Sequence, residues 1–126
     1  MQAYLLVGAG GALGAMARYG FSSVTGHFWP SPFPYATLLI NVLGSLGMGL
    51  LVGLLAKTLP SWQNEARLFV AVGVLGGFTT FSAFSLDAVT LIERSQWMAA
   101  AFYALLSVAI SVAALVLGLL VVRISA

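Results

Sequence analysis

Four long stretches of apolar residues, separated by short polar segments, dominate the pattern of the chain. They run over about residues 4–24, 35–56, 68–92 and 97–122. A helix that crosses the hydrocarbon core of a bilayer needs about 20 mostly apolar residues, and each stretch meets that length. The segments between them carry the prolines and most of the charges, as loops should. The pattern predicts an all-α integral membrane protein, with residues 1–126 forming one membrane domain of four transmembrane helices.

Composition supports a membrane protein and excludes several kinds of site. Hydrophobic residues make up 61% of the chain and charged residues only 6%, whereas a soluble domain averages about 25% charged residues. There is no cysteine, which excludes a disulfide framework and a thiolate metal site. The net charge of +2 comes from so few groups that it does not indicate a nucleic-acid partner.

The charges give little direction to membrane insertion. With four spans, both termini and the middle loop lie on one side, which then holds Lys57, Arg67 and Arg123. The opposite side holds Arg94, with Arg18 near the end of its helix. Three basic residues against two are almost no bias under the positive-inside rule. One alternative is a single orientation set by other factors. The other is insertion both ways round, which would allow an antiparallel, dual-topology homodimer.

Small residues spaced four apart occur in three of the stretches. Such pairs allow two helix backbones to approach closely in a membrane. The pairs are Gly10 with Gly14, Gly49 with Gly53, and Gly73 with Gly77. We therefore expect close helix contacts at these positions.

Polar side chains recur at helical spacing inside the apolar stretches. The stripes are Thr37, Asn41 and Ser45; Thr79, Ser82 and Ser85 beside Phe78, Phe81 and Phe84; and Tyr103, Ser107 and Ser111. Any single hydroxyl is explained by hydrogen bonding between helices. Taken together, the stripes favour the interpretation that they form the wall of a narrow polar path. Hydroxyls, an amide and the edges of aromatic rings all present positive dipole ends, so the solute of such a path should be a small anion.

Two charged residues lie inside the stretches. Arg18 either snorkels to the membrane interface or draws anions towards an entrance. Asp87 could pair with Arg18 or with a basic loop residue. The stretches contain no histidine, cysteine or clustered carboxylates. This composition argues against a transition-metal path, a proton relay or hydrolysis, so we do not expect an enzyme.

Residues 76–85, GGFTTFSAFS, place two glycines and four hydroxyl side chains in the middle of the third stretch. We expect the glycine pair to mark a break in the third helix. A break at membrane depth frees backbone carbonyls, which must be satisfied by protein, water or a bound cation. Carbonyl oxygens suit a hard cation such as sodium.

With TLLINVLGS upstream and MARYG in the first stretch, this segment resembles the Fluc (CrcB) family of fluoride channels over nearly the whole chain. The resemblance implies an antiparallel, dual-topology homodimer with two fluoride pores and a broken third helix. It implies a multi-pass protein of a prokaryotic inner (plasma) membrane that lowers cytoplasmic fluoride by passive electrodiffusive export. The alternative is a small multidrug-resistance-type proton-coupled transporter, which would need a carboxylate in the first span, where this chain has Arg18.

The resemblance also assigns site residues. The backbone carbonyls of Gly76 and Thr79 would hold a structural sodium ion at the dimer interface. Phe81 and Phe84 would face fluoride, and Asn41 would lie beside the pore. The other residues of the implied fluoride pathway are Thr37, Tyr103, Ser107, Ser111, Thr80, Ser82 and Arg18. Phe78 has no role in the family and is expected to pack, and Ala83 and Asp87 replace the Thr and Glu that are common in relatives.

Overall fold

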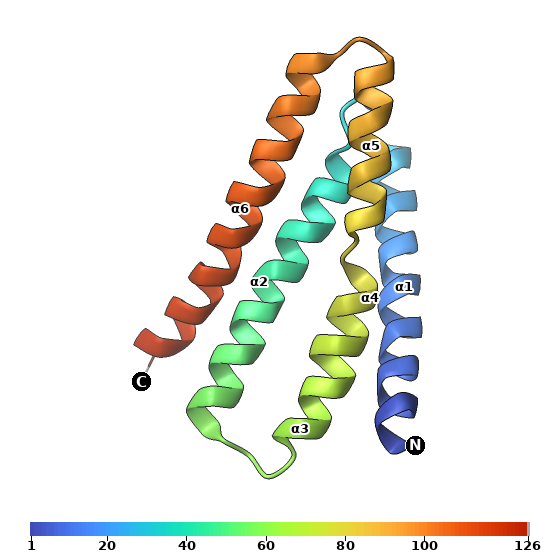
Figure 1. The fold of residues 1–126 in the computed structure, drawn as a ribbon. Helices are drawn as coiled ribbons and strands as arrows, with labels where there is room; N and C mark the ends of the chain where they lie inside the picture. The colour runs from blue at the N-terminus through green and yellow to red at the C-terminus, as the bar shows by residue number, and fades with distance from the viewer. Residues whose placement is uncertain (126) are drawn as a thin grey trace.

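The computed structural model describes residues 1–125 as helices joined by short connections (Figure 1). In chain order they are α1 (Gln2–Phe28), α2 (Tyr35–Thr58), α3 (Gln63–Ala66), the π-helical segment η1 (Arg67–Leu75), α4 (Gly76–Phe78), α5 (Phe81–Glu93) and α6 (Trp97–Ile124). No strand occurs in this part of the chain. The all-α prediction is confirmed, and the helices begin and end within a few residues of the expected stretches. The predicted domain ends at Ala126, which lies outside the described residues.

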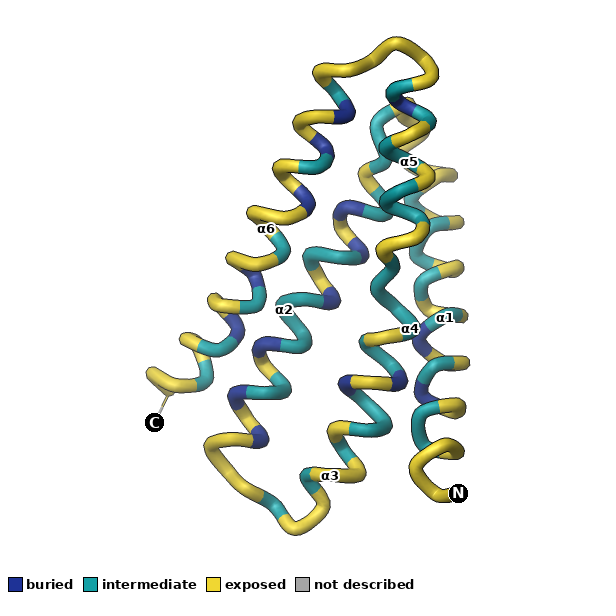
Figure 2. Tube along the Cα trace, viewed as in Figure 1, coloured by how far each residue is buried: buried dark blue, intermediate teal, exposed yellow. Residues whose placement is uncertain are grey.

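Three helical segments are long and apolar enough to cross a membrane: α2, the run Gln63–Glu93, and α6. Helix α1 has 27 residues but is less hydrophobic, because glycines, serines and Arg18 interrupt its apolar sequence. The outer sides of the helices are exposed (Figure 2), and many of these side chains are large and apolar, such as Leu105 and Val108 on α6. Exposed apolar surface of this extent requires lipid or another protein against it.

The helices associate in two groups. Helix α2 packs along α6, and α1 packs along η1 and α4, while α5 contacts α6 (Figure 1). The segment before Thr79 therefore belongs to the α1 side of the molecule, and the segment after Thr80 belongs to the α6 side. Both termini lie towards the end of the molecule that carries α3, and the turn between α5 and α6 lies at the opposite end. The connection between α4 and α5 thus passes from one group to the other.

Glycines set the close approach between α1 and the η1–α4 segment. A Cβ placed on Gly73 would lie 2.9 Å from the Cα of Gly10, and one placed on Gly14 would meet the Val74 carbonyl. A Cβ on Gly77 would lie 2.6 Å from the Gly11 carbonyl oxygen. Each of these contacts is between two backbones, so replacing a glycine with alanine would force the helices apart. The expectation that these glycines permit close helix contact is confirmed.

A second close approach joins α2 to α6. A Cβ on Gly49 would meet the Leu115 carbonyl, and one on Gly118 would lie 2.7 Å from the Leu46 carbonyl oxygen. Gly118 was not foreseen. The signal was present, because Ala114 lies four residues earlier and both are buried on the same face of α6.

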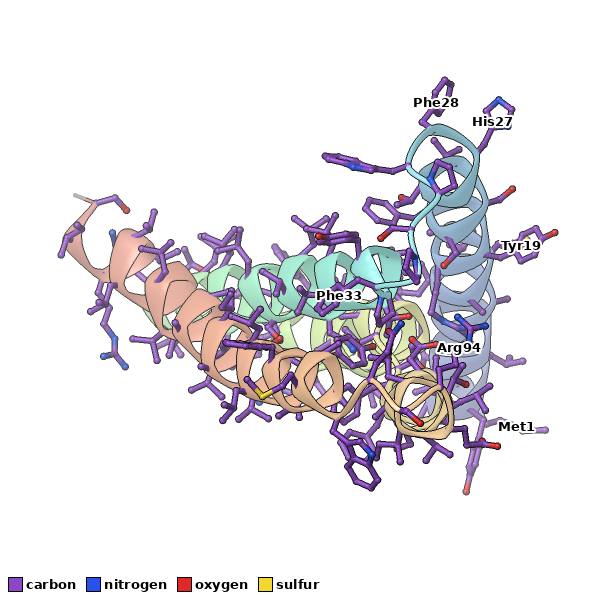
Figure 3. All side chains as sticks on the ribbon, turned by 90° about the horizontal axis from the view of Figure 1, so that it is seen from above. Met1, Tyr19, His27, Phe28, Phe33 and Arg94 are labelled. Atoms are coloured by element: carbon purple, nitrogen blue, oxygen red, sulfur yellow. The ribbon has the colours of Figure 1, made fainter. Side chains whose placement is uncertain are left out.

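A small apolar core lies where the start of α2, the end of α5 and the start of α6 meet. It consists of Leu38, Leu91, Ala100 and Tyr103. Phe33, from the connection before α2, packs against this cluster, whereas Tyr19, His27 and Phe28 point away from the helices (Figure 3). The core therefore joins the end of α5 that lies away from the interruption to the start of α6.

Candidate functional site

The chain leaves helical conformation at Thr79 and Thr80, between α4 and α5. Thr79 has φ −79° and ψ 158°, and Thr80 has φ −154° and ψ 124°. Gly76 and Gly77 are still helical. The expectation that the glycine pair itself forms the interruption is therefore wrong by two residues. A glycine in a helix is tolerated at a cost of about 1 kcal/mol, and the two threonines adopt the extended conformation.

Thr80 begins the helix that follows. Its Oγ1 accepts a hydrogen bond from the Ala83 N–H at 3.1 Å. A threonine at the N-cap satisfies one of the backbone donors that the first turn of a helix leaves unpaired. Ser82, exposed on the first turn of α5, has its hydroxyl 3.2 Å from the same Thr80 Oγ1. The hydroxyls at the start of α5 thus serve the cap.

Asn41 of α2 holds the backbone of Thr80 through both ends of its amide. Its Nδ2 donates to the Thr80 carbonyl at 3.1 Å, and its Oδ1 accepts from the Thr80 N–H at 2.9 Å. This is the pairing that a neighbouring β-strand would supply. Asn41 does lie at the interruption, but its bonds to backbone were not foreseen from the sequence.

Arg18 of α1 reaches the other side of the interruption. Its Nε donates to the Gly77 carbonyl at 3.1 Å. A positive charge is favoured at the C-terminal end of a helix, where carbonyls lack intrahelical donors. The suggested pair between Arg18 and Asp87 is wrong, because Asp87 Oδ2 accepts from the Tyr103 hydroxyl at 3.1 Å. Arg18 therefore places a charge beside the interruption.

A cavity of about 360 Å³ opens between α2, the interruption and α6. Its walls are formed by Asn41, Gly44, Ser45, Met48, Thr79, Thr80, Phe81, Phe84, Ser107, Val108, Ser111 and Leu115. None of these lining side chains is charged. The structure thus brings together most of the expected pathway residues. Four of the expected residues lie outside the wall: Thr37, Ser82, Tyr103 and Arg18. Thr37 lies near the Tyr103 hydroxyl, and the Tyr103 ring packs against Phe84.

Two hydroxyls in the cavity wall are buried without a hydrogen-bond partner. They are Ser107 Oγ and Ser111 Oγ, one turn apart on α6. Leaving a buried hydroxyl unpaired costs about 1–3 kcal/mol. In native proteins such groups usually mark a position where water or an ion completes the bonding. The α6 side of the cavity therefore offers two donors to a bound solute.

Aromatic rings form another part of the wall. The Phe81 and Phe84 ring centres lie 5.3 Å apart, and Phe84 lies 5.0 Å from the ring of Tyr103. Phe81 is 76% exposed, so the single chain covers only a small part of it. Phe78 instead makes an edge contact with Phe21 and lies outside the cavity, which confirms the expected packing role. The ring edges carry partial positive charge and attract anions.

The cavity does not resemble a transition-metal centre. Among residues 1–125 there is no group of three histidine, aspartate or glutamate side chains that could hold a metal ion. The available groups are hydroxyls, ring edges and backbone carbonyls. Hydroxyls and ring edges can receive an anion, and carbonyl oxygens can receive a hard cation.

Residues 5–119 match the protein family described as CrcB-like protein, Camphor Resistance (CrcB). Three relatives are each named fluoride-specific ion channel FluC. The protein of Rhodopseudomonas palustris (strain BisB5) is 52% identical over 120 residues, which cover 95% of this chain and 96% of the relative. The protein of Erythrobacter litoralis (strain HTCC2594) is 48% identical over 100% of this chain and 96% of the relative. The protein of Hyphomonas neptunium (strain ATCC 15444) is 47% identical over 98% of this chain and 97% of the relative.

Proposed function

Since the chain belongs to the CrcB family, we propose that it is a fluoride-selective ion channel. The observation that supports this most directly is the pair of unpaired hydroxyls, Ser107 and Ser111, in a cavity that Phe81 and Phe84 also line. Fluoride is a small anion and a strong hydrogen-bond acceptor. A hydrogen bond to a charged group contributes about 1.5–3 kcal/mol, so two such donors favour fluoride over larger, weaker acceptors.

The channel would lower cytoplasmic fluoride by passive export across a prokaryotic inner membrane. Hydrogen fluoride is a weak acid that diffuses into cells and dissociates, which traps the anion inside. The membrane potential contributes about 2.3 kcal/mol per charge per 100 mV and drives an anion outwards through an open pore. No coupling to protons is required, in contrast to a small multidrug-resistance-type transporter. Helix α1, which carries Arg18 and no carboxylate, does not favour that alternative.

The membrane arrangement that fits this function has four spans. We propose that α1 is the first span, α2 the second, the run Gln63–Glu93 the third with its interruption at membrane depth, and α6 the fourth. A second copy in the opposite orientation would cover Phe81, which is 76% exposed in the single chain. The near balance of three basic residues against two supports insertion in both orientations.

We propose that the carbonyls of Gly76 and Thr79 hold a structural sodium ion between the two copies. Thr79 is extended, so the chain does not continue as a helix past these carbonyls. Neutral oxygen ligands of this kind suit a hard monovalent cation. When bound, sodium supplies a fixed positive charge beside a cavity wall that has none of its own.

Replacing Ser107 with alanine is expected to separate stability from transport. Removal of a buried, unpaired hydroxyl should stabilise the protein by about 1 kcal/mol, because the cost of leaving the hydroxyl unpaired is relieved. Fluoride efflux should nevertheless fall severalfold, because the cavity loses a donor. Thermal unfolding in detergent and efflux from liposomes measure the two effects. Ser23→Ala, at an exposed position on α1, should change neither. A variant that is both less stable and fully active would show that the hydroxyl serves packing.

Growth of a bacterial strain that lacks its own fluoride exporter tests the proposed function in cells. Expression of this protein should restore growth in fluoride, most clearly in acidic medium, where more hydrogen fluoride enters. Membrane fractions should contain the protein at equal levels in all cultures. A strain that holds the protein in its membrane and remains as sensitive as the empty-vector control would contradict the proposal.

A further inference from the structure

Two backbone N–H groups near the interruption do not bond to the carbonyls that would accept from them in a helix. In an unbroken helix each carbonyl accepts from the N–H four residues later. Gly76 would accept from Thr80, and Thr79 from Ala83. In this structure the Thr80 N–H donates to Asn41 Oδ1 at 2.9 Å, and the Ala83 N–H donates to Thr80 Oγ1 at 3.1 Å. The two N–H groups bonded to side chains are therefore the helical donors of the two carbonyls proposed to bind sodium.

Three neighbouring carbonyls, those of Leu75, Gly77 and Thr80, do have hydrogen-bond donors. Leu75 O accepts from both the N–H and the hydroxyl of Thr79. Gly77 O accepts from Arg18 Nε, and Thr80 O accepts from Asn41 Nδ2. These three carbonyls thus have donors, whereas Asn41 and the Thr80 hydroxyl accept the two N–H groups that a helix would direct to Gly76 and Thr79. A cation prefers carbonyls that no N–H already occupies.

We propose that Asn41 and Thr80 are positioning residues that create the cation site without touching the cation. Asn41 accepts the hydrogen bond of the Thr80 N–H, which leaves the Gly76 carbonyl without its helical donor. In the same way, the Thr80 hydroxyl accepts from the Ala83 N–H, which leaves the Thr79 carbonyl without its helical donor. The inference rests on the sodium site of the proposed function. It assigns Asn41 a task that differs from lining the pore, and one that can be measured without any fluoride present.

Thr80 offers closely matched variants. Valine has the shape of threonine and favours the extended conformation that Thr80 adopts, with φ −154° and ψ 124°. Thr80→Val therefore removes the acceptor with little change to the backbone, whereas Thr80→Ser keeps it. Thr90→Val is the control for the chemistry of the change, because Thr90 lies on the same helix and bonds to its own Leu86 carbonyl.

The experiment measures the melting temperature of the full chain in detergent. Sodium chloride is titrated against N-methyl-D-glucamine chloride at constant ionic strength. The wild-type melting temperature should rise with sodium. Thr80→Val and Asn41→Leu should need at least about tenfold more sodium for half of that rise, a loss of affinity of about 1.4 kcal/mol. Thr80→Ser and Thr90→Val should keep the wild-type midpoint.

A wild-type sodium midpoint in both Thr80→Val and Asn41→Leu would overturn the inference. If one of them does not elute as folded protein, the other decides, and if neither does, Thr80→Ala takes the place of Thr80→Val with the same expected shift. Fluoride efflux of the wild-type chain is measured in parallel. Efflux without any sodium-dependent rise in melting temperature overturns the inference and leaves the channel assignment standing. A sodium-dependent rise without efflux overturns the channel assignment instead.

Discussion

Removal of sodium is expected to abolish fluoride efflux from liposomes that contain the purified protein. The cavity wall has no charge, and a few hydrogen bonds cannot replace the hydration of a small anion, which costs tens of kcal/mol by Born estimates. A fixed cation held by the Gly76 and Thr79 carbonyls would lower that cost for both pores of a dimer. Prolonged exchange into a bulky organic cation should therefore remove activity.

Restoring the cation supplies the control for sodium removal. Sodium added back to the exchanged protein should recover efflux, which shows that the protein did not simply denature. Potassium should recover it poorly, because a larger ion fits a small cage of carbonyl oxygens less well. Full efflux after thorough exchange would indicate that the interruption serves helix packing alone and that no cation takes part.

Replacing Phe81 or Phe84 with isoleucine is expected to reduce fluoride efflux by about tenfold or more, which corresponds to about 1.4 kcal/mol in the barrier. Isoleucine keeps an apolar side chain but removes the positive ring edge. Phe81 gives the cleaner test, because it is 76% exposed in the single chain. Phe84 packs against Tyr103, so its replacement also disturbs the core.

Phe102→Ile on the exposed side of α6 is the matched control and should leave efflux unchanged. All variants should elute from size exclusion like the wild-type protein. If both ring variants conduct as well as the control, the phenylalanines are packing residues and the anion takes another route.

The sequence was sufficient to place the long helices, because each apolar stretch is close to the thickness of a bilayer and is bounded by prolines or charges. It was not sufficient to place the interruption. The glycine pair indicated the correct region of the third stretch. However, Gly76 and Gly77 are helical, and the helix is interrupted at Thr79 and Thr80. The π-helical segment Arg67–Leu75 was also missed, since its apolar composition does not differ from that of an α-helix.

The side-chain contacts at the site depended on packing that sequence spacing cannot supply. Asn41 and Thr80 are 39 residues apart, and the amide bonds only to backbone, which has no sequence signature. The same is true of Arg18 and Gly77. The Ser107 and Ser111 stripe could be read directly, because residues four apart share a helix face. Thr37 was placed on the cavity by the same reasoning, yet it lies near Tyr103 and outside the cavity wall.

The most direct test of the channel assignment compares fluoride with chloride efflux from the same liposomes. Purified protein is reconstituted in the presence of sodium with either potassium salt inside, valinomycin sets the membrane potential, and ion-selective electrodes record the release of each anion. Fluoride should leave rapidly, and chloride should remain at the leak of protein-free liposomes. Chloride release comparable to that of fluoride, or no fluoride release from liposomes that contain folded protein, would contradict the assignment.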